Sequence, residues 1–270
     1  MTVIPHRNKS FCKQKRQRAG GTRHRVPLLL LGGLLCALAG CGKIDYTWGW
    51  YVFNPIAPGG REHILLMLSG LKMTLLVTLA SLVGTQVVGF LVALMRLTRN
   101  RPLNGLAAVY LEVFRNIPLF VLIFAVYYVV PILLGIGLSA FQALVLAIVL
   151  NESAFVCEIY RAGIKSISRG HIEAAHSLGM SRGQTMRRIV LPQAMRRMLP
   201  PLANNAIVLA KDSALGAAIA VEDLARQALF LDTLAYRPFE VYTFMALEYL
   251  LLLLLLSQCV KWVERKTVLT

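Results

Sequence analysis

Few acidic residues are placed where they could do chemistry, and two of them interrupt long apolar stretches. Glu152 follows residues 116–151, a run of 36 residues without a charge, and Glu248 interrupts the last apolar run of the chain. A carboxylate at membrane depth costs several kcal/mol and by default marks a functional site. Two interpretations stay open. These acids line a translocation path, or they are protonated or paired structurally with Arg115 or Lys211.

Asn204 and Asn205 lie in a further apolar stretch, where amides either bridge helices by hydrogen bonds or line a path. Bridging is the commoner role. The rest of the sequence lacks catalytic patterns: the 5 histidines are scattered, the 5 cysteines have no CxxC spacing, and no GxxxxGK[ST] loop is available to bind phosphates. The sequence therefore predicts no catalytic residue, no metal site and no cofactor in this chain.

The composition explains why these residues must be positioned by membrane helices. The chain of 270 residues is 57% hydrophobic, with 29 Lys+Arg against 13 Asp+Glu and a net charge of +16. Only 16% of residues are charged, against about 25% in soluble domains. The charge thus reflects missing acids, which argues against a soluble enzyme and against a nucleic-acid binder with its polar surface. We expect an all-α polytopic membrane protein.

Apolar runs of sufficient length predict five core transmembrane helices. The 36-residue run would make one helix of about 54 Å, too long for a core of about 30 Å, so we expect two helices joined at residues 134–137. The expected spans are 73–95, the two halves of 116–151, the interrupted stretch 198–221, and 241–260.

Basic residues alternate between the loops and predict the orientation of the chain. Residues 161–197 hold eight Lys/Arg and one acid, whereas residues 222–240 hold four acids and two arginines. We therefore expect residues 96–108, 161–197 and the C-terminal tail to be cytoplasmic.

The N-terminal segment has three interpretations. Residues 1–25 carry eight Lys/Arg and no acid, and an apolar run, 26–41, follows them. The run is either a retained or dispensable sixth helix, which we favour, or a signal peptide whose processing lipidates Cys41, or the product of a misassigned start codon. Residues 42–63 are then periplasmic.

The basic loop contains a pattern that suits docking to a partner. It predicts a short helix, a glycine stop, and a second helical stretch closed by proline. Glu173 near the start of the helix suits the helix dipole, and small Ala174 and Ala175 let another surface approach closely. The residues of the pattern are Glu173, Ala174, Ala175, Gly179, Ile189, Leu191 and Pro192.

The spacing E-A-A, three residues, G, nine residues, I-x-L-P resembles the EAA loop of bacterial ABC-importer permeases at every position. Blocks from Tyr110 (YLEVFRNIPL), Glu158 (EIYRAGI), Leu191 (LPQAMRRMLPPLANN) and Lys211 (KDSALG) resemble the polar amino-acid permease subfamily of the histidine/glutamine type. The resemblance covers about residues 70–270. It implies the type I importer permease fold over residues 64–270, with residues 165–192 as the loop that couples to an ATPase.

The resemblance also implies a function and partners. The chain would be the permease subunit of an ATP-driven importer that moves a polar amino acid from periplasm to cytoplasm. ATP and Mg²⁺ would act on separate cytoplasmic ATPase subunits. A periplasmic solute-binding protein and a second permease copy or paralogue would complete an assembly in the bacterial inner membrane. Glu152, Asn204, Asn205 and Glu248 would be candidates for the translocation path, where the acids could meet the α-ammonium of an amino acid.

Two other classes of function remain. A non-transporting membrane scaffold or receptor subunit could use the loop only to dock a cytoplasmic partner, but it would leave the intramembrane acids without a purpose. A passive channel would need rings of pore-lining residues that this sequence does not show.

Overall fold

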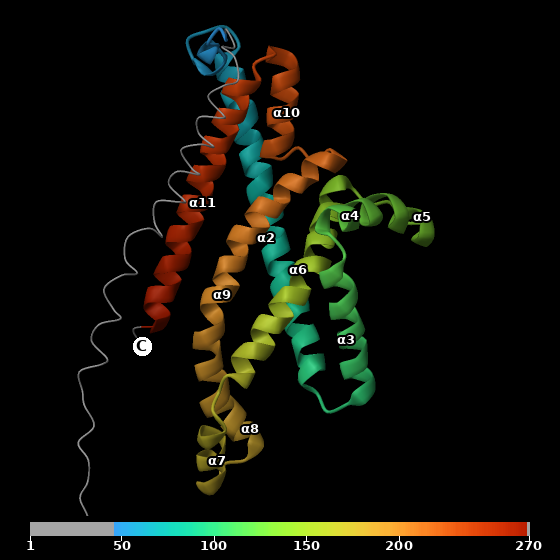
Figure 1. Ribbon diagram of the computed structural model, residues 1–270, viewed down its shortest axis with the longest axis vertical. Coiled ribbons are helices and arrows are strands. Elements are labelled where there is room, and N and C mark those ends of the chain that lie inside the picture. Colours follow the sequence, from blue (N-terminus) through green and yellow to red (C-terminus); the bar gives the residue numbers. More distant parts are fainter. Residues whose placement is uncertain (1–45, 269–270) are drawn as a thin grey trace, which may run out of the picture. The chain divides into compact units, whose positions relative to one another are not determined.

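The computed structural model describes residues 46–268, which Figure 1 shows in colours that follow the sequence. The predictions for residues 1–25, for the run 26–41 and for Cys41 lie outside the described residues.

The chain divides into two units, Met1–Trp48 and Gly49–Thr270. Of the first unit only residues 46–48 are described, where the rings of Tyr46 and Trp48 meet edge to face with centroids 5.8 Å apart. The second unit contains all of the helices discussed below.

Helices are the only regular elements among residues 46–268, which confirms the expected all-α class. Short 3₁₀ segments occur at η1 and η4, and single π-helical turns at η2 and η3. In chain order the elements are η1 (Trp50–Phe53), α2 (Gly60–Leu97), α3 (Arg101–Asn116), α4 (Leu119–Phe124), η2 (Ala125–Val129), α5 (Val130–Leu134), α6 (Ala140–Lys165), α7 (Arg169–Ser177), α8 (Arg182–Thr185), η3 (Met186–Val190), α9 (Leu191–Asp212), η4 (Ser213–Ile219), α10 (Leu224–Ala235) and α11 (Pro238–Val268).

Three of these helices, α2, α6 and α11, are long and apolar enough to cross a membrane. A fourth candidate is the pair formed by α3 and the segment Leu119–Leu134, which is bent by 105°. The expected break at residues 134–137 is confirmed, because α5 ends at Leu134 and Gly135 adopts a left-handed backbone conformation. The helix α6 then starts with a capping box between Ser139 and Gln142.

The expected fourth span, 198–221, differs from the structure in its limits. Its helix, α9, starts earlier, at Leu191, and passes through Pro200 and Pro201 without ending. It is less apolar than the other spans because it also carries two asparagines, Lys211 and Asp212. Two other predicted loops contain helices: α3 begins inside residues 96–108, and α10 occupies much of residues 222–240.

The central contact of the second unit is between α2 and α6, which lie side by side in Figure 1. Small residues on α2 make this close approach possible. A Cβ built on Gly84 would lie 2.6 Å from Val149 Cγ2, and one on Gly89 would lie 2.7 Å from Val156 Cγ1. Glycine at these two positions therefore sets how closely α2 and α6 pack.

The bend between α3 and α4 leaves carbonyl groups without their helical hydrogen bonds, and side chains of α6 bond to these groups instead. Asn151 Nδ2 donates to the carbonyl oxygens of Phe114 at 2.6 Å and Ile117 at 3.2 Å. One turn earlier on α3, the Tyr110 hydroxyl lies 2.7 Å from Ser153 Oγ and donates to Leu150 O at 3.0 Å. The bonds from Asn151 satisfy carbonyl groups at the bend that would otherwise be unpaired away from water, and the Tyr110 bonds tie α3 to α6.

Candidate functional site

The predicted docking helix is α7, and the glycine of the pattern explains how it ends. Gly179 has φ +76°, a left-handed conformation that glycine adopts without steric cost. Its N–H donates to His176 O at 2.9 Å, and Met180 N–H donates to Ala175 O at 3.1 Å. This pair of bonds is a Schellman motif, which requires a residue like glycine directly after the helix. The three residues between the EAA triplet and Gly179 therefore place Ala175 and His176 where their carbonyl groups can accept these two bonds.

Two residues of the EAA triplet are on the surface of the protein, and the third is buried against it. Glu173 and Ala174 are exposed, whereas Ala175 is buried with 1% of its surface accessible. Leu178 at the end of α7 is 81% exposed, which is unusual for a leucine outside a lipid-facing surface. An exposed acid, a small side chain and an apolar tip on one short helix are suited to insertion into a groove of another protein.

The second half of the pattern belongs to the start of a long helix, which corrects one prediction. Leu191 and Pro192 lie where the π-helical turn η3 passes into α9, inside a helix that is continuous from Arg182 to Asp212. Proline has no N–H to donate, and it lies here directly after a π-helical turn. Pro192 therefore does not close the second helical stretch, because the helix continues through it. The π-helical turn η3, which contains Ile189, joins α8 directly to α9.

A buried cluster connects this loop to the spans. Val190 and Ala194 pack with Val156 of α6 and with Ile167, and Ile172 of α7 packs against the same cluster. On the surface, Arg197 donates to Ser166 O at 2.6 Å and to Ser166 Oγ at 3.0 Å. The loop is thus fixed to the ends of both α6 and α9.

Glu158 and Arg161 form the ion pair that their spacing predicts, with Arg161 Nε 2.9 Å from Glu158 Oε2. Both residues lie at the cytoplasmic end of α6 in the predicted orientation. The pair is partly exposed, so its contribution to stability is small.

Two of the four candidate path residues come together. Asn205 Nδ2 donates to Glu152 Oε2 at 2.9 Å, and both residues are buried, with 6% and 8% of their surfaces accessible. Asn205 therefore bridges α9 to α6, as predicted. Among the described residues Glu152 forms no ion pair, so pairing with Arg115 or Lys211 does not occur in this structure.

The other two candidate path residues, Asn204 and Glu248, do not contact the Glu152–Asn205 pair through a hydrogen bond. Asn204 is exposed although it is adjacent to Asn205, since neighbouring residues point to different sides of a helix. Glu248 lies on α11, half-buried, and its Oε2 is buried without a hydrogen-bond partner among residues 46–268. The structure thus joins Glu152 with Asn205 and leaves Asn204 and Glu248 outside that contact.

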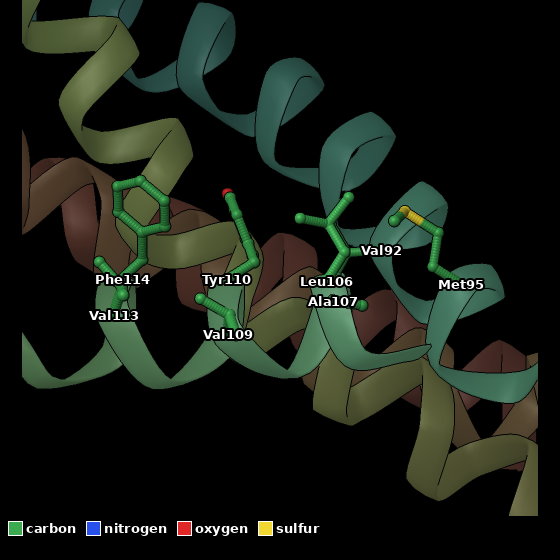
Figure 2. A pocket seen from close by; sticks show the side chains of 8 residues that line it. All are labelled: Val92, Met95, Leu106, Ala107, Val109, Tyr110, Val113 and Phe114. Carbon is green, nitrogen blue, oxygen red and sulfur yellow. The ribbon is translucent and has the colours of Figure 1, made fainter. Parts of the chain in front are cut away.

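Two hollows lie along α3, and their linings differ. The larger, of about 340 Å³, lies between α2 and α3, and Figure 2 shows Val92 and Met95 of α2 beside a row of α3 side chains. Its lining is apolar except for Tyr110, whose hydroxyl is bonded to α6. Such a groove offers no group that would recognise a polar solute.

The second hollow, of about 250 Å³, is polar and was not anticipated from the sequence as a site. It is lined by Leu111, Glu112, Arg115, Asn116 and Phe155, from α3 and α6. Arg115 lies in the last turn of α3, directly before the bend that leads to α4. The sequence signal for the hollow was an acid, a base and an amide at helical spacing beside Pro118.

A further buried acid was missed. Asp223, in the segment between η4 and α10, is fully buried and caps α10 by accepting from Arg226 N at 2.9 Å. Burial raises its pKa to about 7. Thr74 Oγ1 of α2 accepts from the neighbouring Leu224 N–H at 3.2 Å, so this corner joins α10 to α2. Within residues 46–268, no group of three or more His, Cys, Asp or Glu could hold a metal ion.

The chain is similar in sequence to membrane subunits of known transport systems. Residues 86–268 match the family model described as binding-protein-dependent transport system inner membrane component. The probable glutamine ABC transporter permease protein GlnM of Bacillus subtilis is 39% identical, over 76% of this chain and 94% of the relative. The glutamine transport system permease protein GlnP of Escherichia coli is 36% identical, over 75% of this chain and 93% of the relative.

Solved structures agree with these relatives. The crystal structure of an amino acid ABC transporter with histidines superposes with a TM-score of 0.75 at 35% identity, and covers 82% of this chain and 100% of that one. An inward-facing structure of the MetNI methionine ABC transporter has a TM-score of 0.65 at 22% identity over 76% of this chain and 98% of that one, which supports the fold alone.

Proposed function

The chain belongs to the family of binding-protein-dependent transport system inner membrane components, and we propose that it is the permease subunit of an importer for a polar amino acid. The family is one of membrane subunits, so the chain is a transport subunit and not an enzyme. The proposed direction is from periplasm to cytoplasm, driven by ATP and Mg²⁺ on a separate ATPase. The names of the relatives, which are glutamine and arginine transport permeases, support an amino acid as the solute.

The observation that carries the proposal is the way α7 packs against the ends of α6 and α9. Its outer side presents Glu173 and Ala174, while Ile172 of the same helix packs against the cluster shared by α6 and α9. A force applied by an ATPase to α7 would therefore move the ends of both helices together. Such rigid-body movement is a common way to switch between two conformations. Gly179, Ile189, Leu191 and Pro192 keep this connection in place.

The proposed path uses the contact between the same two helices. The carboxylate of Glu152 and the amide of Asn205 are polar groups buried in spans, where such groups are costly and mark solute pathways. Movement of α9 against α6 would open or close this contact. Asn204 and Glu248 are proposed to line the same path from α9 and α11 in the assembled transporter.

The proposed partners are two cytoplasmic ATPase subunits, a periplasmic solute-binding protein and a second permease copy or paralogue in the inner membrane. Lys261, Arg265 and Lys266 near the end of α11 support a cytoplasmic C-terminus. Leucines 250, 251, 254 and 255 of α11 are exposed and suit lipid or a neighbouring permease.

The test is ATP hydrolysis by the reconstituted complex in liposomes, with binding protein and a panel of amino acids supplied in the lumen or outside. Stimulation by one group of amino acids, together with their uptake, is the expected result. Binding of the ATPase without stimulation by any solute would favour the scaffold. Solute flux without ATP would favour a channel.

A further inference from the structure

The polar hollow between α3 and α6 holds two opposite charges that are not paired with each other. Glu112 and Arg115 are three residues apart on α3, a spacing at which acids and bases usually meet. Within residues 46–268, however, Glu112 and Arg115 do not form an ion pair with each other, unlike Glu158 and Arg161, which have the same spacing. Glu112 and Arg115 instead have separate supports.

Those supports keep the two charges apart. Asn116 Nδ2 donates to Glu112 Oε1 at 3.2 Å, which holds one oxygen of the carboxylate and leaves the other open. The Arg115 guanidinium carbon lies 5.4 Å from the centroid of the Phe155 ring on α6, a cation–π contact. This contact places the guanidinium over the ring, and among residues 46–268 no hydrogen bond occupies its N–H donors.

The hollow lies beside the part of α2 that is expected to cross the membrane. The α3 helix runs beside α2, where Ala107 and Leu111 pack with Val92, and Phe114 reaches the cluster that contains Val77. Val77 and Val92 both belong to the uncharged stretch of α2, residues 73–95. Exposed charges at this level would be costly in contact with lipid, so a wet path or a polar ligand is the environment that suits them.

From this geometry we propose that Glu112 and Arg115 form a binding site for the zwitterionic end of an α-amino acid. Arginine binds a carboxylate through two parallel N–H donors, and the open oxygen of Glu112 accepts from an ammonium group. Positions three apart on a helix have Cβ atoms about 5–6 Å apart, which suits groups borne on one carbon atom. The volume of about 250 Å³ suits a small solute.

The site deepens the proposed function and rests on it. It recognises the part that all α-amino acids share, so the solute side chain is left to other residues. Leu111, which also lines the hollow, offers that side chain no polar partner.

The test uses the whole permease–ATPase complex in nanodiscs and measures equilibrium binding of radiolabelled L-glutamine, L-arginine and L-histidine. Competitors are the methyl esters, which lack the carboxylate, and the N-acetyl derivatives, which lack the ammonium. For the wild type, each derivative should bind roughly 10- to 100-fold more weakly than its amino acid, the factor for a lost hydrogen bond to a charged group.

Each variant should lose the ability to distinguish the amino acid from one of the two derivatives. Arg115→Gln should bind the amino acid and its methyl ester alike and still reject the N-acetyl form, whereas Glu112→Gln should do the reverse. Arg101→Gln, at the start of the same helix, is the matched control and should behave as wild type. Arg115→Lys should retain part of the discrimination because it retains the charge.

The outcomes separate this site from the transport function. If wild-type complex binds amino acids and both variants keep both discriminations, or lose all binding while remaining assembled with the ATPase, the site is wrong and the importer stands. If no amino acid binds to the wild type or stimulates ATP hydrolysis, the importer itself is wrong, and the site with it.

Discussion

Asn205 Nδ2 of α9 donates a hydrogen bond of 2.9 Å to Glu152 Oε2 of α6, and both side chains are buried. The two residues are 53 positions apart in the chain. The loop that contains α7 lies between them along the chain, so the hydrogen bond joins the two helices that this loop connects. A movement of that loop would therefore act on the Glu152–Asn205 hydrogen bond through both helices.

Asn205→Leu should destabilise the protein by about 1–3 kcal/mol, because it removes the donor and leaves a buried carboxylate without its partner. Thermal unfolding of the purified protein in detergent measures the change. Asn204→Leu is the matched control, since Asn204 is exposed, and it should have a much smaller effect. Equal losses in the two variants would contradict a special role for the Glu152–Asn205 bond.

Gly89→Leu should separate α2 from α6. A Cβ at this position would lie 2.7 Å from Val156 Cγ1 and 3.1 Å from Ser153 O, and overpacking of this kind costs about 1–3 kcal/mol or more. The readout is the melting temperature in detergent. Gly105→Leu on α3, where a Cβ would meet nothing within 4 Å, should leave stability unchanged or slightly raised. An unchanged melting temperature for Gly89→Leu would mean that the helices do not approach as described.

Gly179→Ala should weaken binding of the ATPase while leaving the spans intact. An L-residue in the left-handed conformation costs roughly 1–2 kcal/mol, so the stop of α7 loosens. Affinity for the ATPase, measured by titration of the purified subunits, should fall several-fold with little change in melting temperature. Gly183→Ala, inside α8 with open space around it, is the control and should bind normally.

Glu173→Lys should abolish uptake while the protein still inserts into the membrane. The substitution reverses the charge on the exposed side of α7, which is the proposed contact with the ATPase. Uptake of labelled amino acid into proteoliposomes, with membrane content checked by immunoblot, measures both effects. Glu222→Lys, also exposed but outside the docking loop, should transport normally. Normal uptake in Glu173→Lys would refute the docking role.

Asp223 should make stability depend on pH. Its pKa is raised from 3.8 to about 7 in the folded protein, so the folded state holds a proton that the unfolded state has lost between these values. Stability should therefore fall as the pH rises from about 4 to about 7. Asp223→Asn, which is neutral throughout, should reduce this fall in melting temperature. A fall of the same size in both proteins would assign the effect to other groups.

Much of the fold could be predicted from the sequence because hydropathy and charge act locally along a membrane chain. The uncharged run 73–95 lies within α2, and the glycine-containing break at 134–137 separates α5 from α6. The docking pattern could also be predicted, since the EAA triplet lies in one short helix, α7, and Gly179 follows it as the residue that ends it. The helix α3 was missed because its amphipathic sequence and basic start resemble a loop at the membrane surface.

The tertiary structure alone decided which polar residues meet. Nothing in the spacing of Glu152, Asn204 and Asn205 indicates which asparagine faces α6, because one residue along a helix turns a side chain by about 100°. Likewise, the sequence places Glu112 and Arg115 at pairing distance. Asn116 contacts Glu112 within α3, whereas the Phe155 ring under Arg115 belongs to α6 and comes close only through packing. Periodicity along the chain determines which segments cross the membrane. The Asn205–Glu152 and Arg115–Phe155 contacts form between helices, so they exist only in the packed structure.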